Sequence, residues 1–172
     1  MRIVFMGTPE FAVPSLKALL DSRHTVVGVV TGPNRPAGRS LKIRSSPVKA
    51  LAQQHYLRLL QPENLEAPEF IGELQEINPD LCLVVAFRIL PPAVIGIPEL
   101  GCINLHASLL PELRGAAPIN WALMQGLTRT GITAFLIERR VDTGGILLQR
   151  EIEILPEDDH GSLADQIGRA HV

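Results

Sequence analysis

Short apolar runs alternate along this chain with stretches in which apolar residues recur every three or four positions. Residues 2–6 form an apolar run that ends at a Gly-Thr-Pro turn, and residues 11–20 then have helical spacing, so we expect a strand, a tight loop and a helix. Residues 25–30 and 81–87 are almost purely apolar, which is typical of strands buried in the middle of a sheet. The other expected strands are 57–60, 103–105, 131–136 and 146–154, and the other expected helices begin at Pro47 after a Ser46 cap and span 69–77 and 118–124.

This alternation of strands and helices predicts an α/β fold with a doubly wound, mostly parallel sheet. The 172 residues, of which 46% are hydrophobic, suit one domain, and we assign it to residues 1–166. Ligands of such sheets bind beyond the carboxyl ends of the strands. The ends of the strands at 81–87 and 103–105 are therefore the first places to look for a site.

Net charge, cysteine positions and the length of the apolar runs exclude several classes of protein. A formal net charge of −2 excludes a globally basic nucleic-acid binder, so any RNA contact has to be local. Cys82 and Cys102 lie inside apolar runs, which predicts buried free thiols, and no ligand spacing for zinc occurs, so we expect no metal. The longest apolar run, 81–87, is far too short to cross a membrane, and we expect a cytoplasmic protein.

The turn Gly7-Thr-Pro-Glu10 follows the first predicted strand, where a dinucleotide-binding loop would stand. It has one glycine, and Pro9 lacks the backbone N–H that a phosphate cradle uses. The sequence therefore argues against nucleotide binding at this loop.

Asn104 and His106 are two residues apart at the end of a predicted strand, so their side chains share one face. An amide and an imidazole side by side suit attack on a carbonyl carbon, because the amide can stabilise an oxyanion while the imidazole handles a proton. Asp142, in a polar loop, is a candidate for the carboxylate that orients His106. The alternative is structural, with the Asn capping a turn and the His packed half-buried.

Four motifs, in their order and spacing, resemble one enzyme family. They are Met6-Gly-Thr-Pro-Glu-Phe-Ala12, Asn104-Leu-His-Ala-Ser-Leu-Leu-Pro111, Arg114-Gly-Ala-Ala-Pro-Ile119 and Val141-Asp-Thr-Gly144. Together they resemble the methionyl-tRNA formyltransferase family over nearly all of residues 1–166. The resemblance implies a Rossmann-like formyltransferase fold in which Asn104, His106 and Asp142 act together on 10-formyltetrahydrofolate.

The same resemblance implies a reaction and its partners. A monomeric enzyme would transfer the formyl group of 10-formyltetrahydrofolate to the α-amine of initiator methionyl-tRNA, for translation initiation. Alternatives are a relative that formylates a nucleotide-linked amine, a formyltetrahydrofolate hydrolase, or a truncated chain that binds folate or RNA without turnover. The residues that the resemblance assigns to the folate cleft are Phe87, Leu90, Ser108, Leu109, Leu110 and Pro111.

Residues 31–50 contain no acidic residue but carry five of the sixteen Lys and Arg residues. Because several Pro, Gly and Ser residues interrupt this segment, we expect an irregular, mobile, positively charged arm that projects from the sheet. A solvated loop with scattered charges is the alternative. The resemblance places a tRNA-binding loop here, and it assigns the contact to Arg35, Arg39, Lys42 and Arg44, with Arg39 in Pro-Ala-Gly-Arg matching the functional arginine of the family.

The chain departs from the family pattern in two regions. The family commonly has a glycine before Ile-Leu-Pro, whereas Arg88 directly precedes Ile89 here, so the loop beside the folate site is one residue shorter. The family also has a second, C-terminal domain that resembles an OB-fold, and we expect it to be missing. Residues 167–172 leave the family pattern, and the codons ATC GGA AGA GCA CAC GTC, which start a common sequencing adapter, can encode them. We expect a non-native tail rather than a divergent helix end, which sequencing the source gene past the Gln166 codon would test.

Overall fold

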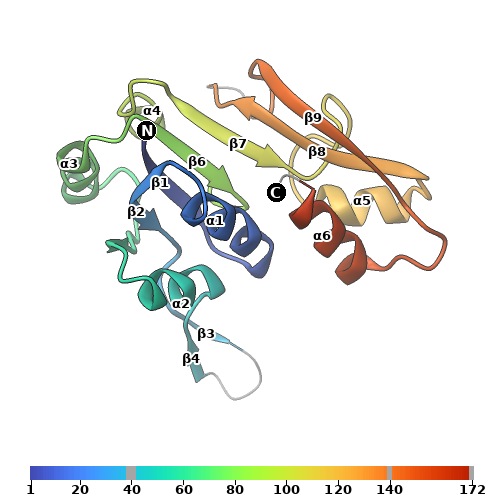
Figure 1. Cartoon of the computed structure of the whole chain (residues 1–172), viewed down its shortest axis with the longest axis horizontal. Coiled ribbons are helices and arrows are strands. Elements are labelled where there is room, and N and C mark those ends of the chain that lie inside the picture. Colours follow the sequence, from blue (N-terminus) through green and yellow to red (C-terminus); the bar gives the residue numbers. More distant parts are fainter. Residues whose placement is uncertain (38–41, 139–140, 171–172) are drawn as a thin grey trace.

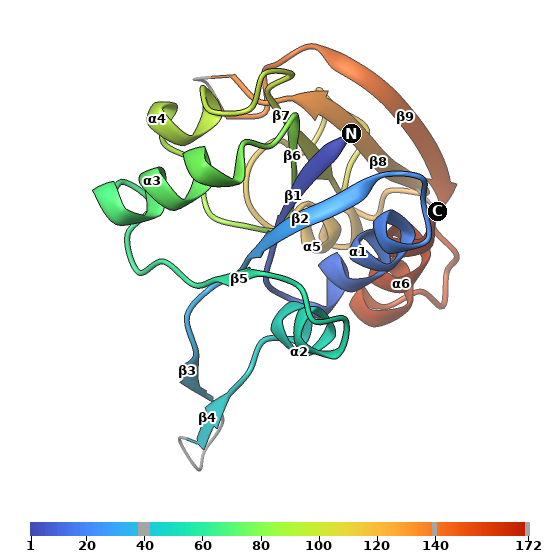
Figure 2. The same ribbon diagram turned by 60° about the vertical axis from the view of Figure 1, so that its left-hand side comes forward.

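A computed structural model describes residues 1–37, 42–138 and 141–170, with the backbone alone described at 35–37 and 42–44. Its centre is a seven-stranded sheet with the order β5-β2-β1-β6-β7-β8-β9 (Figures 1 and 2). The strands are β1 (Arg2–Gly7), β2 (Thr25–Val30), β5 (Leu59–Leu60), β6 (Leu81–Val85), β7 (Cys102–His106), β8 (Arg129–Leu136) and β9 (Ile146–Glu153), with β3 (Arg35–Ala37) and β4 (Lys42–Arg44) in a separate pair. The helices are η1 (Glu10–Ala12, a 3₁₀ turn), α1 (Val13–Leu20), α2 (Pro47–Gln54), α3 (Pro68–Ile77), α4 (Pro92–Ile95), α5 (Pro118–Met124) and α6 (His160–Arg169).

The predicted α/β, mostly parallel sheet is confirmed. Strands β5, β2, β1, β6 and β7 run parallel, whereas β8 pairs antiparallel with both β7 and β9. The apolar runs of β1 and β6 lie in the middle of this sheet, where helices cover both faces, as their continuous hydrophobicity predicts. The sheet is thus mixed, with an antiparallel pair at one edge.

Helices pack on both faces and bury three apolar clusters. On one face α3 and α4 cover Val4, Met6 and Val84, and on the other α1 and α2 cover Phe5 and Val29. A third cluster joins α5 and α6 to β8. Figure 2 shows α3 and α4 on one side of the sheet and α1, α2, α5 and α6 on the other.

The strand order reverses between β1 and β6. After β1 the chain builds outward to β2 and β5, and it then returns to the other side of β1 with β6 and β7. At such a switch point the loops that follow neighbouring strands turn away from each other and leave a crevice. The loops after β1 and β6 therefore define where a ligand can enter.

Three sequence-based expectations are corrected. The run 81–87 was predicted as one strand, but β6 ends at Val85 because Ala86 adopts a left-handed conformation with φ 47°. The segment after β2 is not irregular: β3 and β4 pair as a short antiparallel hairpin in which Pro36 lies opposite Ile43. It does project from the body, as expected (Figure 1).

The third correction concerns the end of the chain, where the predicted helical turn at Ser162 is part of a longer helix. Helix α6 begins at an Asp159 capping box and runs to Arg169, with Ile167 fully buried. Residues 167–169 thus continue the helix, while His171 and Val172 lie outside the described residues. Their non-native origin stays a prediction.

Within the described residues, the structure contains no helix with the length and hydrophobicity that a membrane crossing requires.

Candidate active site

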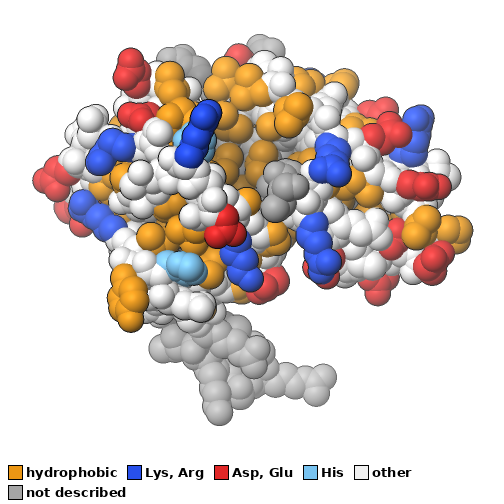
Figure 3. Space-filling model, viewed as in Figure 1, with side chains coloured by type: hydrophobic (Ala, Val, Ile, Leu, Met, Phe, Trp, Pro, Cys, Tyr) orange, Lys and Arg blue, Asp and Glu red, His pale blue; other side chains and the backbone are white. Residues whose placement is uncertain are grey.

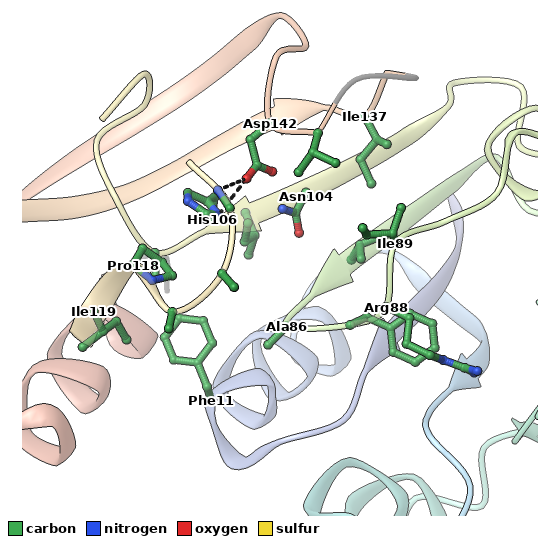
Figure 4. A pocket seen from close by; sticks show the side chains of 18 of the residues that line it. Phe11, Ala86, Arg88, Ile89, Asn104, His106, Pro118, Ile119, Ile137 and Asp142 are labelled. Atoms are coloured by element: carbon green, nitrogen blue, oxygen red, sulfur yellow. Dashed lines mark hydrogen bonds and ion pairs between the residues drawn. The ribbon is translucent and has the colours of Figure 1, made fainter. Parts of the chain in front are cut away.

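The main pocket lies at the carboxyl ends of β6 and β7, at the switch point, and has a volume of about 620 Å³. Ligand pockets usually have about 300–1,000 Å³. Its lining is mostly apolar, with Asn104, His106 and Asp142 as a polar group on one wall (Figure 4). The other labelled lining residues are Phe11, Ala86, Arg88, Ile89, Pro118, Ile119 and Ile137.

Asn104 points into this pocket from the middle of β7 (Figure 4). Its side chain is half-buried, and it has no hydrogen-bond partner among the residues that the structure describes. An amide without a partner inside the protein can donate to a bound carbonyl oxygen. Asn104 therefore lies beside His106 on the pocket wall, and its amide N–H is available to a ligand.

His106, at the end of β7, is buried and held by a backbone carbonyl. Its Nε2 lies 2.9 Å from the carbonyl oxygen of Leu113. A carbonyl only accepts hydrogen bonds, so Nε2 carries the hydrogen. The other ring nitrogen, Nδ1, lies 3.7 Å from Oδ2 of Asp142. The ring is thus oriented mainly by Leu113, and Nδ1 faces the carboxylate across the pocket wall.

Asp142 is placed by a tight loop after β8. Its Oδ2 accepts a hydrogen bond of 2.8 Å from the Gly115 N–H, and its backbone is left-handed with φ 52°, which Asp tolerates better than most residues. Gly144 packs directly on the Leu136 carbonyl, and a Cβ at this position would overlap that oxygen. The Asp-Thr-Gly motif therefore has a structural reason: the glycine lets the loop close tightly enough to bring the carboxylate to His106.

Left-handed residues other than glycine gather around the pocket. Ala86, Ala117 and Asp142 line it, and Leu113 supplies the carbonyl that holds His106, with φ values of 47°, 54°, 52° and 52°. Such conformations cost roughly 1–3 kcal/mol each and persist only where packing enforces them. Their concentration here makes the pocket the candidate functional site.

Two of the predicted folate residues, Phe87 and Leu90, line the pocket. The departure at Arg88 has a structural explanation, because its guanidinium donates to the carbonyls of Pro62 and Glu63 and lies 5.1 Å from the centre of the Phe87 ring. The charged group points away from Asn104 (Figure 4). Arg88 thus fastens the loop after β6 to the segment after β5 and leaves the wall beside Asn104 apolar, while the shortening of this loop relative to the family stays a prediction.

The other four predicted folate residues, Ser108 to Pro111, lie outside the pocket lining. The Ser108 carbonyl accepts from Thr133 Oγ1 at 2.6 Å, and the Leu110 N–H donates to the same hydroxyl at 3.0 Å. Gln149 of β9 donates to the Leu110 carbonyl at 2.8 Å. This segment therefore supports the end of β7 through β8 and β9, because its polar groups are turned toward those strands.

The basic hairpin lies apart from the pocket. Arg35, Lys42 and Arg44 are at its strand positions, and Arg39 lies outside the described residues. Lys49, at the start of α2, donates to Gln61 Oε1 at 2.6 Å and to Asn34 Oδ1 at 3.2 Å, so it holds the base of the hairpin. On the face in Figure 3, the described basic side chains are interspersed with acidic ones and form no broad positive field.

Sequence reasoning missed several lining residues. Phe11 and Pro9 follow β1, Ile119 is the second residue of α5, and His160 begins α6. Pro9, Phe11 and Ile119 belong to motifs that resemble the family, but nothing in those motifs assigns them to a pocket wall. His160 carries no sequence signal, because only the fold brings α6 next to the loop after β1. The Leu113 carbonyl was equally invisible, since backbone groups leave no pattern in the sequence.

Cys82 and Cys102 are buried free thiols, as predicted, and are paired in register across β6 and β7. The hydrogen bond between their side chains, together with burial, raises the pKa of Cys82 far above its usual range. In the described part of the chain no group of His, Cys, Asp or Glu side chains is arranged to hold a metal ion.

Comparison with known proteins identifies the family to which this arrangement belongs. The model of the family described as "Formyl transferase" matches residues 1–171. The chain belongs to the formyl transferase family. It is 53% identical over 169 residues to methionyl-tRNA formyltransferase of Caldanaerobacter subterraneus subsp. tengcongensis and 50% identical over 170 residues to that of Geobacter sulfurreducens. These matches cover 97% and 98% of the chain but 55% and 54% of the relatives.

This formyl transferase family member is therefore homologous to the formyltransferase domain of methionyl-tRNA formyltransferases, and it spans about half the length of these curated relatives. Solved structures with the same fold include phosphoribosylglycinamide formyltransferases. That of Streptococcus pneumoniae TIGR4 has a TM-score of 0.82 at 21% identity, covering 98% of this chain and 91% of its own. That of Bacillus halodurans has a TM-score of 0.80 at 21% identity, covering 97% and 87%.

Proposed function

We propose that this domain transfers the formyl group of 10-formyltetrahydrofolate to the α-amine of initiator methionyl-tRNA. The observation that carries the proposal is the pocket wall itself, where a partnerless amide, a fixed imidazole and a buried carboxylate meet at the switch point. The identity of 53% to a methionyl-tRNA formyltransferase favours this acceptor over others of the family.

In the proposed reaction the amine attacks the formyl carbon, and the carbonyl oxygen gains negative charge as the tetrahedral intermediate forms. Asn104 donates its amide N–H to that oxygen. His106 takes up at Nδ1 the proton that the attacking amine loses, since Nε2 is committed to Leu113, and Asp142 stabilises the resulting positive ring from 3.7 Å. When the carbon–nitrogen bond to the folate breaks, His106 returns a proton to the departing nitrogen.

The two ends of the pocket suit two substrates. Phe87, Ile89, Leu90 and Ile137 form an apolar end that can accept the flat ring of the folate. Phe11 and Ile119 form the opposite end, next to the loop after β1, and we assign the amine-bearing residue to it. Asn104 and His106 lie between these ends, where the formyl group would have to pass.

We assign the phosphates of the tRNA to the basic hairpin. Arg35, Arg39, Lys42 and Arg44 provide four charges within one short segment of a chain whose net charge is −2. Replacing Arg39 and Lys42 together by Gln should weaken tRNA binding and flatten its dependence on salt, because fewer counterions are then released from the phosphates. Folate affinity should not change. An unchanged salt dependence would contradict this assignment.

The decisive experiment follows the label of 10-formyltetrahydrofolate carrying a radioactive formyl group. Purified protein is incubated with it and with methionyl-tRNA, with phosphoribosylglycinamide, or with buffer alone. The proposal predicts label on methionyl-tRNA only. Label on phosphoribosylglycinamide would contradict the proposal and indicate a transferase that acts on a nucleotide-linked amine. Release of the label as formate in buffer alone would indicate a hydrolase.

A further inference from the structure

The turn Gly7-Thr8-Pro9 is not explained by catalysis, yet it connects the pocket to the basic hairpin. Pro9 lines the pocket, whereas Thr8 beside it is not among the lining residues. The Thr8 hydroxyl accepts a hydrogen bond of 3.1 Å from the Gly32 N–H, at the point where the chain leaves β2 for the hairpin. The incoming end of the hairpin is thereby fastened to the loop at the pocket.

The outgoing end of the hairpin is fastened to the same place. Thr31, which is fully buried, has its hydroxyl 2.9 Å from Ser46 Oγ and 3.5 Å from Thr8 Oγ1. Since Thr31 donates to Thr8, the Ser46 hydroxyl donates to Thr31, and Ser46 in turn accepts from the Lys49 N–H as the cap of α2. Thr8, Thr31 and Ser46 therefore form one chain of hydroxyls, which we call the hydroxyl clamp.

A second set of contacts closes the other side of the hairpin base. Gln61, after β5, donates to the Gly32 carbonyl at 2.8 Å and accepts from Lys49 Nζ at 2.6 Å. Lys49 also reaches Asn34. The hairpin itself is a separate two-stranded sheet that extends away from the body (Figures 1 and 2), so these end contacts determine its direction.

We propose that Thr8 and Thr31 are positioning residues, whose hydroxyl clamp fixes the direction of the basic hairpin relative to the amine end of the pocket. The proposal rests on the function proposed above. A tRNA held by the hairpin must bring its terminal amine to His106, and Thr8 is adjacent to the pocket residue Pro9. If the hairpin could change its direction, only a fraction of the molecules would have its charges placed for tRNA binding. The apparent affinity for tRNA would then fall in proportion to that fraction.

The test uses Thr31→Val, which replaces the buried hydroxyl by a methyl group of the same size. Thr31→Ser keeps the hydroxyl and should restore parental behaviour. Thr130→Val is the matched control, since Thr130 is also a buried threonine, but it lies on β8 and its hydroxyl has no partner in the described residues. Thr8→Val is a second variant, because it removes the acceptor of the Gly32 N–H from a half-buried position.

Three quantities are measured on residues 1–172: hydrogen exchange of the Gly32 amide, the dissociation constant for methionyl-tRNA, and that for tetrahydrofolate. In Thr31→Val and Thr8→Val we expect Gly32 exchange to accelerate at least about fivefold and tRNA binding to weaken at least about threefold. Tetrahydrofolate binding should stay unchanged. Thr31→Ser and Thr130→Val should match the parent in all three.

The possible failures are distinguishable. If the parent protein binds tetrahydrofolate but no tRNA, the proposed function fails and the clamp loses its role with it. If the parent binds tRNA and Thr31→Val accelerates Gly32 exchange without weakening tRNA binding, the clamp is merely structural. If Thr31→Val weakens tRNA and tetrahydrofolate equally, or if Thr31→Ser does not restore binding, the effect is general destabilisation. Each of these results overturns the proposal.

Discussion

Replacing Asp142 by Asn tests the electrostatic role of the carboxylate without removing its structural contact. Asn keeps an oxygen that accepts from the Gly115 N–H, now 2.8 Å away, so the loop should hold its place. Only the charge facing His106 is lost. The two side chains are 8% and 9% exposed and 3.7 Å apart, and at an effective dielectric constant of about 20 the attraction to a charged ring is about 4 kcal/mol. Transition-state stabilisation of that size corresponds to about a thousandfold in rate.

The assay is single-turnover formyl transfer to methionyl-tRNA with protein in excess, so that product release does not limit the rate. Asp165→Asn serves as the control, because Asp165 makes an exposed ion pair of 3.6 Å with Arg169 far from His106, and its rate should equal that of the parent. The double variant Asp142→Asn, His106→Gln should be no slower than the slower single variant, since the carboxylate acts only through the ring. A rate for Asp142→Asn within about threefold of the parent, or multiplicative losses in the double variant, would show that the two groups act independently.

Two further substitutions test the loop after β8 and the turn that precedes α6. Gly144→Ala should destabilise the fold by about 1–3 kcal/mol and lower the transfer rate about a hundredfold, because the new Cβ overlaps the Leu136 carbonyl and displaces Asp142. Gly145→Ala is the control, because its Cβ meets open space, and it should change neither quantity. Denaturant unfolding and rate assays measure the two effects. Hydrogen bonds from the Ser162 hydroxyl and the Leu155 N–H lower the pKa of the Asp158 carboxyl. The ionised carboxylate therefore stabilises the fold fully above the ordinary carboxyl pKa, and this stabilisation is lost as the pH falls through the lowered pKa. Unfolding midpoints across the acid range should therefore fall less steeply for Asp158→Asn than for the parent, and equal slopes would count against this role.

The order of strands and helices could be predicted because each element carries its own local signal. The helix from Pro47 to Gln54 begins at its predicted Ser46 cap, and the strand from Thr25 to Val30 has its predicted bounds, because a cap and a β-branched run are properties of adjacent residues. The β3–β4 hairpin was missed because its strands are three residues each and β3 contains a proline. Strands of three residues are too short to show the alternation of apolar and polar residues by which a strand is recognised.

The side chains of the site were predictable, but the groups that orient them were not. Asn104 and His106 share a strand face by simple alternation, so their common wall follows from the sequence. The carbonyl that fixes His106 comes from Leu113, whose left-handed backbone is set by tertiary packing rather than by its residue type. Ser108 to Pro111 share a motif with His106, yet the chain turns after the strand and directs their polar groups to Thr133 and Gln149.

Asn104 is the proposed donor to the formyl oxygen, and one measurement tests this role most directly: the rate of formyl transfer from 10-formyltetrahydrofolate to methionyl-tRNA by Asn104→Ala. The half-buried amide has no partner among the described residues, so its loss should leave folding and folate affinity intact. Removal of an oxyanion donor costs about 2.7–4 kcal/mol of transition-state stabilisation, so transfer should slow about a hundredfold or more. A variant that folds, binds folate and transfers the formyl group within a few-fold of the parental rate would contradict the assignment of this pocket as the catalytic site.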